Sequence, residues 1–448
     1  MRVHGLYASL LLMALSCALL SAVEAPRYLA LSENPPLVNP DLRRPGFWIS
    51  HHPNPDSLLM DASNIAKFNR RVLRKGDVGQ IEQSSAIIGA THLKRMINDC
   101  YNMAKGHGKF RQDGSPTDKQ FWQTLRDATN LKAIKNVNRC RFAFPLYYTD
   151  QRLLPLAEVL SDVALDLEFD YLQNSGFDIA EPLVIYHESA DGNWVFGAGR
   201  ASSGWYPKKN LAFLERNDWL AYQQSKDFVI TIRDKSDLYL DEGRIRYYGL
   251  LRLGTRLPLR AEHDTVYELK LPDGQSAYIA KGEVHRGYLP YTARNVYELG
   301  FSALNAPYGW GDLNAEYDCS GFIKQLFQCF GIYLPRNGAA QYNASLSLHE
   351  FEGADNSNQR EALIEEFALP AQTLLRMPGH IMLYLGSIDG RAYALHSLWG
   401  IRRPAANGED DVIAAAKTLV SDLSLGEGGK RKSLLLRLSG IGAIKDEK

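Results

Sequence analysis

The sequence predicts a multidomain protein of the α+β class. Its 448 residues are too many for one ordinary hydrophobic core. Two consecutive blocks carry short strands and turns at regular spacing, a pattern typical of small β-barrels. The last part of the chain instead places a helical segment before antiparallel strands, which indicates an α+β domain. We therefore expect two small barrels followed by an α+β domain.

The chain begins with a segment that has the anatomy of a secretory signal. Residues 1–25 contain one Arg, an apolar stretch from Leu6 to Leu20 and then small residues. This stretch is too short and too poorly flanked for a membrane-spanning helix. Pro26 opposes cleavage after Ala25, and Cys17 loosely resembles a lipoprotein acceptor site. Cleavage and a lipid anchor through Cys17 both stay open, and we expect export to the periplasm or cell envelope.

Charge and cysteine content exclude several classes of function. Lys and Arg number 51, as do Asp and Glu, so no basic field is available to hold a nucleic acid. The sequence has no CxxC motif, so redox and zinc-ribbon patterns are absent. An exported protein permits disulfides, and Cys100 with Cys140 is one possible pair, although sequence separation fixes no distance.

Residues 26–144 are expected to form an arm that wraps around other domains. Pro-rich irregular stretches alternate there with the helical spacing of ASNIAKFNRRVL and THLKRMINDCYNMAKG. Few runs in this segment alternate apolar with polar residues, as a half-buried strand would. We expect extended chain with short helices rather than a sheet.

The two strand-rich blocks are expected to span residues 145–220 and 221–292. In the first, Asp191-Gly192 predicts a turn between two strands. In the second, Pro272-Asp273-Gly274 marks the turn within TVYELKLPDGQSAYIAK. The glycine-rich GAGRASSG and the later GEGGK lack the spacing of nucleotide-binding loops, so no nucleotide site is implied.

Residues 293–448 are expected to form the α+β domain. CSGFIKQLFQCFG predicts a helix with one apolar stripe, ended by Gly331. PGHIMLYLGSIDGRAYALHS predicts a strand pair around Asp389-Gly390, and KTLVSDLSLGEGGKRKSLLLRLSG a second pair. The predicted stripe consists of Phe322, Ile323, Leu326, Phe327 and Phe330.

Cys319 opens the predicted helix, where a nucleophilic thiol is favoured. A thiol attacks a carbonyl as its thiolate, and the positive end of the helix dipole stabilises that anion. Cys329 lies near the opposite end, where the dipole opposes ionisation. We expect Cys329 to be a small buried residue.

Activation of a thiol needs a base, and the base needs a group that orients it. His380 starts one predicted strand and His396 lies at the far end of the next. A strict two-residue turn at Asp389-Gly390 would put the two rings on opposite faces of the sheet. A catalytic pair requires an odd-length loop or a bulge. We predict the shifted register, in which His396 pairs with Met382.

Several motifs, in this order, resemble the NlpC-type cell-wall peptidases, a papain-like family with a Cys-His-His arrangement. They are NAPYGWGDLNAEYDCSGF, PGHIMLYLG and ALHS. Upstream, HHPNPDSLLMDASNIAKFN resembles the N-terminal stabilising arm of that family. DGNWVFGAGRASSGWYPKKNLAF and FVITIRDKSDLYL with LLRLGTRLP resemble its two bacterial SH3 domains. The likeness covers nearly the whole chain after residue 25.

The resemblance implies an activity and a set of catalytic residues. The substrate would be a peptidoglycan stem peptide with a free N-terminal L-alanine, cut between γ-D-glutamate and a diamino acid such as diaminopimelate. Cys319 would be the nucleophile and His380 its base. His396 would orient His380, as an Asn or Asp does in related triads. The resemblance implies a monomer that needs no cofactor.

The resemblance also implies residues that bind the substrate. Tyr308 would contact the oxyanion or the substrate; the alternative is packing against Trp310. Asp318 and Ser320 would hold the free amine of the peptide, which would offset the unfavourable effect of Asp318 on thiol ionisation. The alternative for Asp318 is capping of the helix N-terminus. Trp205 and Tyr206 are candidates for the wall that the first SH3 domain adds.

Three other interpretations stay open. Cys319, His380 and His396 could bind zinc, although no fourth ligand is evident. The same fold could act as an amidase or acyltransferase, which shares the first chemical step. The chain could also be a catalytically silent peptidoglycan-binding module.

Overall fold

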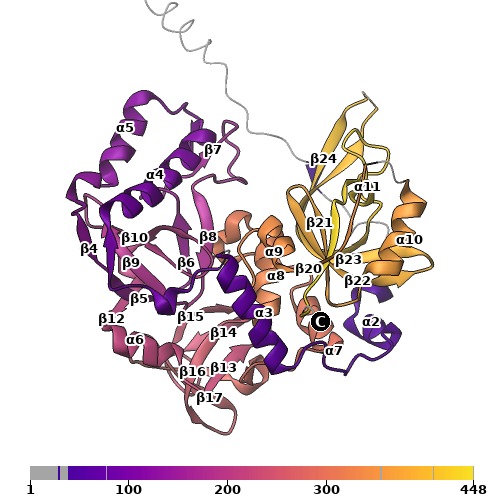
Figure 1. The fold of residues 1–448 in the computed structure, drawn as a ribbon, viewed down its shortest axis with the longest axis horizontal. Helices are drawn as coiled ribbons and strands as arrows, with labels where there is room; N and C mark the ends of the chain where they lie inside the picture. Colours follow the sequence, from indigo (N-terminus) through magenta and orange to yellow (C-terminus); the bar gives the residue numbers. More distant parts are fainter. Residues whose placement is uncertain (1–28, 31–38, 77, 354–355, 407, 447–448) are drawn as a thin grey trace, which may run out of the picture.

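A computed structural model of the protein describes residues 29–30, 39–76, 78–353, 356–406 and 408–446. The predicted signal segment and Cys17 lie outside the described residues. Within the described ranges, no helix is both long enough and apolar enough to span a bilayer. The described residues form three seven-stranded sheets and two two-stranded ones, with helices between and around them, so the α+β multidomain architecture is confirmed (Figure 1).

The first sheet forms a small barrel with strand order β12-β5-β9-β10-β11-β6-β8. The predicted turn at Asp191-Gly192 joins β9 and β10, and Gly192 takes the positive φ of 72° that such a turn needs. A bulge between Phe196 and Gly197 bends β10. The strands are β5 (Arg141–Pro145), β6 (Thr149–Arg152), β8 (Gln173–Phe177), β9 (Leu183–Glu188), β10 (Trp194–Ala198), β11 (Ser203–Pro207) and β12 (Leu211–Leu214).

The second sheet forms another small barrel, with strand order β15-β14-β18-β17-β16-β13-β19. Its predicted turn joins β17 and β18, with Gly274 at φ 87°. The strands are β13 (Phe228–Thr231), β14 (Lys235–Tyr239), β15 (Tyr247–Arg252), β16 (Arg256–Glu262), β17 (Val266–Lys270), β18 (Ser276–Ala280) and β19 (Val284–Arg286).

Helix α6 (Arg216–Gln223) ties the two barrels together. Trp219 is fully buried, and its indole Nε1 donates to the carbonyl of Ala143 in the first barrel at 3.1 Å. Tyr222 donates its hydroxyl to the carbonyl of Lys270 in the second barrel at 2.6 Å. Both rings lie in one continuous hydrophobic cluster with side chains of both sheets. The barrels therefore share part of their core.

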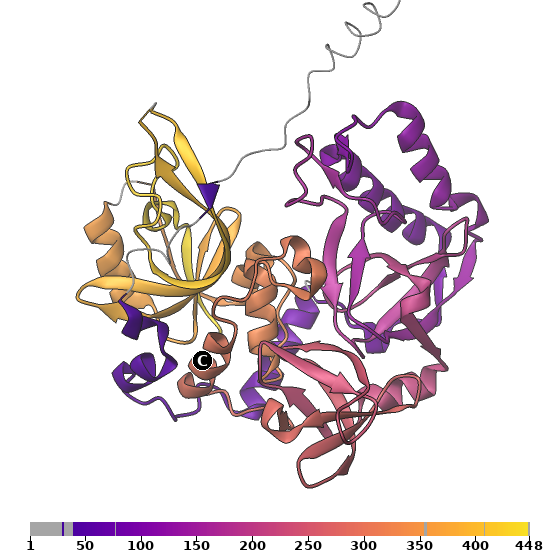
Figure 2. The ribbon, with the colours of Figure 1, turned by 180° about the vertical axis from the view of Figure 1, so that it is seen from behind.

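The N-terminal segment divides between two partners (Figures 1 and 2). The side chains of Phe68 and Val72 are fully buried in the hydrophobic core of the C-terminal domain, which the third sheet and its helices form. Leu93 and Ile97 instead pack with the core of the first barrel. The helices of the first group are α2 (Pro45–His51) and α3 (Ala62–Lys75), and those of the second are α4 (Ala90–His107) and α5 (Lys119–Ala128). Two short strand pairs, β2 (Ile87–Gly89) with β4 (Val137–Arg139) and β3 (Phe110–Arg111) with β7 (Leu160–Ser161), complete the segment.

Asn69 of α3 fixes this segment to the C-terminal domain. Its side-chain Nδ2 donates to the carbonyl of Gly331 at 2.8 Å, and its Oδ1 accepts from the backbone N–H of Tyr333 at 2.9 Å. Two residues further on, Arg71 donates to the carbonyl of Ala344 at 3.2 Å. The arm is therefore held by directed hydrogen bonds as well as by apolar packing.

The third sheet has strand order β1-β24-β23-β22-β21-β25-β20 and helices on both faces. Ile381, Leu383 and Leu385 of β22 face a core shared with α7 and α8, and Met382 and Tyr384 face one shared with α10 and α11. The strands are β1 (Leu29–Ala30), β20 (Leu346–Glu350), β21 (Thr373–Met377), β22 (His380–Ile388), β23 (Arg391–Pro404), β24 (Asp410–Asp422) and β25 (Gly440–Ala443). The helices are α7 (Ala293–Ser302), α8 (Cys319–Gln328), α9 (Gly338–Ala344), α10 (Ser357–Phe367) and α11 (Leu434–Arg437).

The register of the β22–β23 hairpin confirms the prediction that required a bulge. Asp389 and Gly390 form a two-residue turn with φ of 51° and 72°. The pairing then shifts by one residue at Leu385, so His380 and His396 lie on the same face of the sheet. The pairs on either side of the shift are Ile388 with Arg391 and Leu383 with Leu395.

One prediction was wrong. The segment SLLLRL was expected to pair with KTLVSDL as a strand, but it forms α11, because Ser433 caps a helix by accepting from the N–H of Leu436 at 3.3 Å. The possible disulfide between Cys100 and Cys140 is not formed, and both thiols are free. Cys100 packs with the first barrel's helical cover and Cys140 with the core shared by the barrels, so the two side chains belong to different clusters.

Candidate active site

Cys319 is the first residue of α8, as predicted. Asp318 caps this helix, because its Oδ1 accepts from the backbone N–H of Gly321 at 2.7 Å. The predicted apolar stripe of α8 is buried in the core. At Gly321 a Cβ atom would lie 1.8 Å from Oδ1 of Asp312, so only glycine fits there. Cys329, in contrast, is fully buried and donates to the carbonyl of Gln325 at 3.6 Å, as expected of a packing residue.

The two histidine rings are joined by a hydrogen bond. His380 Nε2 lies 2.8 Å from His396 Nδ1, and His396 Nε2 lies 3.0 Å from the hydroxyl of Ser421 on β24. His396 is fully buried. If His380 donates from Nε2, His396 accepts at Nδ1 and donates from Nε2 to Ser421, which gives three of the four ring nitrogens a partner. In this tautomer His380 Nδ1 carries a free lone pair.

Cys319 and His380 share their immediate surroundings. The backbone N–H groups of Ile381, the residue after His380, and of Ser320 lie near enough to the Cys319 sulfur to lower the pKa of its thiol. Burial raises the pKa of the Tyr308 phenol, and the charges of Asp318 and Cys319 raise it further. Tyr308 therefore lies close to Cys319. The structure therefore brings together Cys319, His380, His396 and Tyr308.

Burial favours the neutral forms of both the Cys319 thiol and the His380 ring. Burial, and then the charge of Asp318, raise the pKa of the Cys319 thiol to about 12. Burial, and then the charge of Arg437, lower the pKa of His380 to about 4, and burial lowers the pKa of His396 well below its usual value. The helix terminus alone thus does not ionise the thiol, but His380 remains free to accept its proton.

Asp318 is paired with a buried arginine that sequence reasoning missed. Arg336 Nη1 and Nη2 lie 3.0 and 2.7 Å from Asp318 Oδ1 and Oδ2, and Nη1 also donates to the Ser320 hydroxyl at 3.0 Å. Burial opposes ionisation of Asp318, but Arg336 holds its pKa below the usual value. The negative charge next to Cys319 is therefore compensated within the chain. Arg336 also donates from Nε to Ser175 of the first barrel at 3.0 Å.

A chain of buried ion pairs runs from Arg336 into the first barrel. Asp312 is fully buried and lies 3.2 Å from Arg336 and 3.7 Å from Arg252. Arg252, also fully buried, donates from Nε and Nη2 to Asp178 at 2.9 and 3.0 Å. Charges of this kind must be paired to be tolerated in an interior. The network therefore fixes the barrels relative to the helix that carries Cys319.

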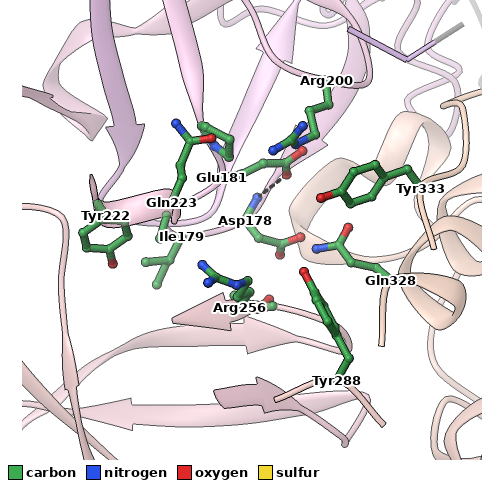
Figure 3. A pocket seen from close by; sticks show the side chains of 13 residues that line it. Asp178, Ile179, Glu181, Arg200, Tyr222, Gln223, Arg256, Tyr288, Gln328 and Tyr333 are labelled. Carbon is green, nitrogen blue, oxygen red and sulfur yellow. Dashed lines mark hydrogen bonds between the residues drawn. The ribbon is translucent and has the colours of Figure 1, made fainter. Parts of the chain in front are cut away.

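A small cavity lies where this network ends (Figure 3). Its volume is 110 Å³, and its lining joins both barrels to the C-terminal end of α8 at Gln328. Figure 3 shows Asp178, Glu181, Arg200 and Tyr333 around it, and Glu181 accepts there from the N–H of Asp178 at 3.3 Å. It shares no lining residue with the groove beside His380. We interpret it as a gap between domains.

A larger groove of 390 Å³ opens beside His380 and Tyr308. One wall is aromatic: Phe169 of the first barrel lies 5.2 Å from Trp310 and 4.7 Å from Trp399, measured between ring centroids. The lining also includes Arg402, Arg431 and Arg437.

Trp205 and Tyr206 were candidates for a wall supplied by the first barrel, but both are fully buried inside that barrel. Phe169 supplies the barrel's contribution instead. Among the ring contacts of the described residues, none joins Tyr308 to Trp310. The Trp310 ring instead packs on Phe169, and on Tyr171 with 5.8 Å between ring centroids.

Over the described ranges, no three or more His, Cys, Asp or Glu side chains are grouped as metal ligands would be, and this includes Cys319, His380 and His396.

Comparisons with known proteins identify two parts of the chain. Residues 305–402 match the NlpC/P60 family, and residues 161–207 match an SH3 domain of the SH3b1 type. A gamma-D-glutamyl-L-lysine dipeptidyl-peptidase from Bacillus cereus is 31% identical over 144 residues, which cover 31% of this chain and 42% of that protein. This chain thus aligns with less than half of that relative's length. The structure of an NlpC/P60 endopeptidase from Photobacterium damselae subsp. piscicida has the same fold, with a TM-score of 0.76 at 19% identity, covering 94% of this chain and 100% of that one.

Proposed function

Since this chain carries an NlpC/P60 domain and an SH3b domain, we propose that it is an exported cysteine endopeptidase of peptidoglycan. It would cleave the bond between γ-D-glutamate and diaminopimelate in stem peptides with a free N-terminal L-alanine. The observation that carries the proposal is the hydrogen bond between His380 Nε2 and His396 Nδ1, which leaves His380 Nδ1 available as a base in the surroundings it shares with Cys319. The Bacillus cereus relative is named for a γ-D-glutamyl bond of the same kind.

The first half of the proposed reaction forms an acyl-enzyme. His380 Nδ1 takes the proton of the Cys319 thiol as the sulfur attacks the γ-carbonyl carbon of D-glutamate. The resulting oxyanion is stabilised by the backbone N–H of Cys319 and the Tyr308 hydroxyl. When the carbon–nitrogen bond breaks, His380 gives the proton to the leaving amine of the diamino acid. His396 holds the His380 ring throughout.

The second half releases the glutamyl product. A water molecule gives a proton to His380 Nδ1 and attacks the thioester carbon. The carbon–sulfur bond breaks, and the proton returns from His380 to the sulfur, which regenerates the neutral pair. Both halves use one base in two directions, which suits a ring that is neutral at the start.

We further propose that the substrate's ammonium group binds Asp318 together with Ser320. Asp318 Oδ1 already accepts from Gly321, Ser320 and Arg336, but Oδ2 accepts only from Arg336 among its described contacts. A carboxylate oxygen has two lone pairs, so Oδ2 has room for one more donor. The Asp318 side chain keeps 14% of its surface exposed, enough for a ligand to reach it.

Export of the protein is part of the proposal. Its support is the composition of residues 1–25, since the substrate lies outside the cytoplasm. Both cleavage of this segment and lipidation of Cys17 are compatible with a periplasmic or envelope enzyme.

The test is incubation with defined stem peptides and analysis of the products by mass. Wild type and Cys140→Ala, which alters a free thiol outside the site, should release a γ-glutamyl product, whereas Cys319→Ala should release none. Peptides with an acetylated N-terminus should be cut at least tenfold more slowly, since a charge-assisted hydrogen bond is worth about 1.5–3 kcal/mol. Activity of Cys319→Ala would refute the thiol mechanism, and equal cleavage of acetylated peptides would refute the amine contact.

A further inference from the structure

Three guanidinium groups converge on the groove beside His380. Arg402 lies near the end of β23, Arg431 in the turn after β24, and Arg437 at the end of α11. Arg431 and Arg437 lie beyond residues 305–402, the part of the chain that matches the family. The helix α11 that replaces the expected strand is what brings Arg437 to the groove.

These three arginines have no acidic partner among the described residues. Neighbouring arginines do: Arg403 lies 3.6 Å from Asp411, and Arg391 lies 3.3 Å from Asp422. Arg431 contacts Asp410 only through its backbone N–H, at 3.3 Å.

The three like charges also act on one another. Burial, and then the charges of Arg431 and Arg402, lower the pKa of Arg437. A guanidinium is too strong a base to escape such repulsion by losing its proton at neutral pH. An anion is therefore the group that would relieve it, and a carboxylate matches the planar fork of arginine in two parallel hydrogen bonds.

The position of the cluster indicates which part of a ligand it meets. Asp318 and Ser320, which hold the amine end in the proposed function, do not line this groove. His380 and Tyr308 do line it, and His380 delivers a proton to the leaving amine. The groove therefore receives the part of the peptide that follows the cut bond.

We propose that Arg402, Arg431 and Arg437 form a subsite for the carboxylates of the leaving part of the substrate. This inference rests on the proposed function for the direction of the peptide. Diaminopimelate carries a side-chain carboxylate that lysine lacks, so the subsite selects diaminopimelate peptides with free carboxylates. Amidation of those carboxylates removes the charge and one acceptor from each, so it weakens recognition.

The kinetic test compares three tripeptides that differ only in the third residue: meso-diaminopimelate, its side-chain amide and L-lysine. The wild type should cleave the diaminopimelate peptide with a kcat/KM about tenfold or more above the other two, as one charge-assisted hydrogen bond allows. Arg437→Gln and Arg431→Gln should each remove most of this preference through KM. Arg403→Gln, next to the cluster but paired with Asp411, should leave the preference unchanged.

A binding test separates this inference from the proposed function. The same peptides are titrated calorimetrically into the Cys319→Ala protein with and without Arg431→Gln, a substitution of an exposed side chain. The subsite is supported if the diaminopimelate peptide binds more tightly than the other two and if Arg431→Gln abolishes this difference. This result would support the subsite even if the wild type cleaved none of the peptides. Absence of cleavage would overturn only the proposed function. Equal binding of all three peptides, or cleavage of all three at equal rates, overturns the subsite.

Discussion

Asp318, the residue before the proposed nucleophile Cys319, forms a two-pronged ion pair with Arg336, with nitrogen–oxygen distances of 3.0 and 2.7 Å. An acid at this position would by itself raise the pKa of the thiol. Arg336 offsets that effect and also pairs with Asp312 at 3.2 Å. One arginine thus supports both the cap of α8 and the buried acid beneath it.

Replacing Arg336 by Met should destabilise the protein strongly. Buried Asp318 would lose its arginine partner and buried Asp312 one of its two, and breaking a buried pair in this way costs about 3–5 kcal/mol. Urea unfolding measures the effect. The matched control is Arg294→Met, whose ion pair with Asp56 is exposed to solvent and is therefore expected to contribute little to stability. Equal losses in both variants would contradict a special role for Arg336.

Gly321→Ala should impair both stability and activity. The added Cβ would meet Asp312 Oδ1 at 1.8 Å, so α8 or the buried acid must move, and overpacking costs about 1–3 kcal/mol. The shift would displace Cys319, two residues away. At Gly282 no atom lies within 4 Å of an added Cβ, so Gly282→Ala is the control that should behave like the wild type. Thermal unfolding and peptide cleavage report the two effects.

His396→Ala should lower kcat/KM by about a hundredfold or more, the scale of general acid–base catalysis. His380 would lose the acceptor at 2.8 Å that fixes its tautomer. Ser421→Ala removes only the outer partner of His396, at 3.0 Å, so its loss should be smaller. His396→Asn should recover part of the activity, since it can still accept a hydrogen bond. If His396 positions His380, His396→Ala should lose the most activity, and Ser421→Ala and His396→Asn should each lose less. An equal loss in all three variants would contradict this role.

The acid limit of catalysis should lie well below the usual range of histidine. His380 must be neutral to accept a proton, and its pKa in the free protein is lowered to about 4. The acid limb of kcat/KM, which reports the free enzyme, should therefore fall near pH 4 to 5 rather than near 6.5. A limb at pH 6.5 or above would show that burial does not control this base.

Acid should also destabilise the fold in a defined window. His380 and His396 have lowered pKa values in the folded protein, so between about pH 6.5 and 4 the unfolded chain binds protons that the folded protein does not. The free energy of unfolding should therefore fall as the pH falls through this range. The variant His396→Gln should show a shallower decrease, measured by urea unfolding at several pH values.

Local patterns in the sequence predicted those parts of the site that neighbours along the chain determine. The apolar stripe and position of α8 followed from helical periodicity, and the need for both histidines on one face predicted the shifted register of β22 and β23. The segment SLLLRL was misjudged because three leucines suit a buried strand or a buried helical turn equally well, and the Ser433 cap decides for the helix.

The remaining features depend on contacts between distant segments. Arg336 meets Asp318 across a loop, Phe169 reaches the groove from another domain, and the cluster of Arg402, Arg431 and Arg437 is assembled by a long hairpin and α11. The periodicity of apolar residues along the sequence cannot predict such contacts between distant segments. Trp205 and Tyr206 show the converse, since their aromatic character fits a binding wall but packing places them inside a barrel.

The hydrogen bonds of Asn69 also bear on how the chain is made. Its partners, Gly331 and Tyr333, are translated more than 260 residues later, so α3 cannot form these hydrogen bonds until the C-terminal domain has been made. The α4 and α5 part of the arm can instead pack on the first barrel, which is made much earlier. The two halves of the arm therefore reach their final positions at different stages of synthesis.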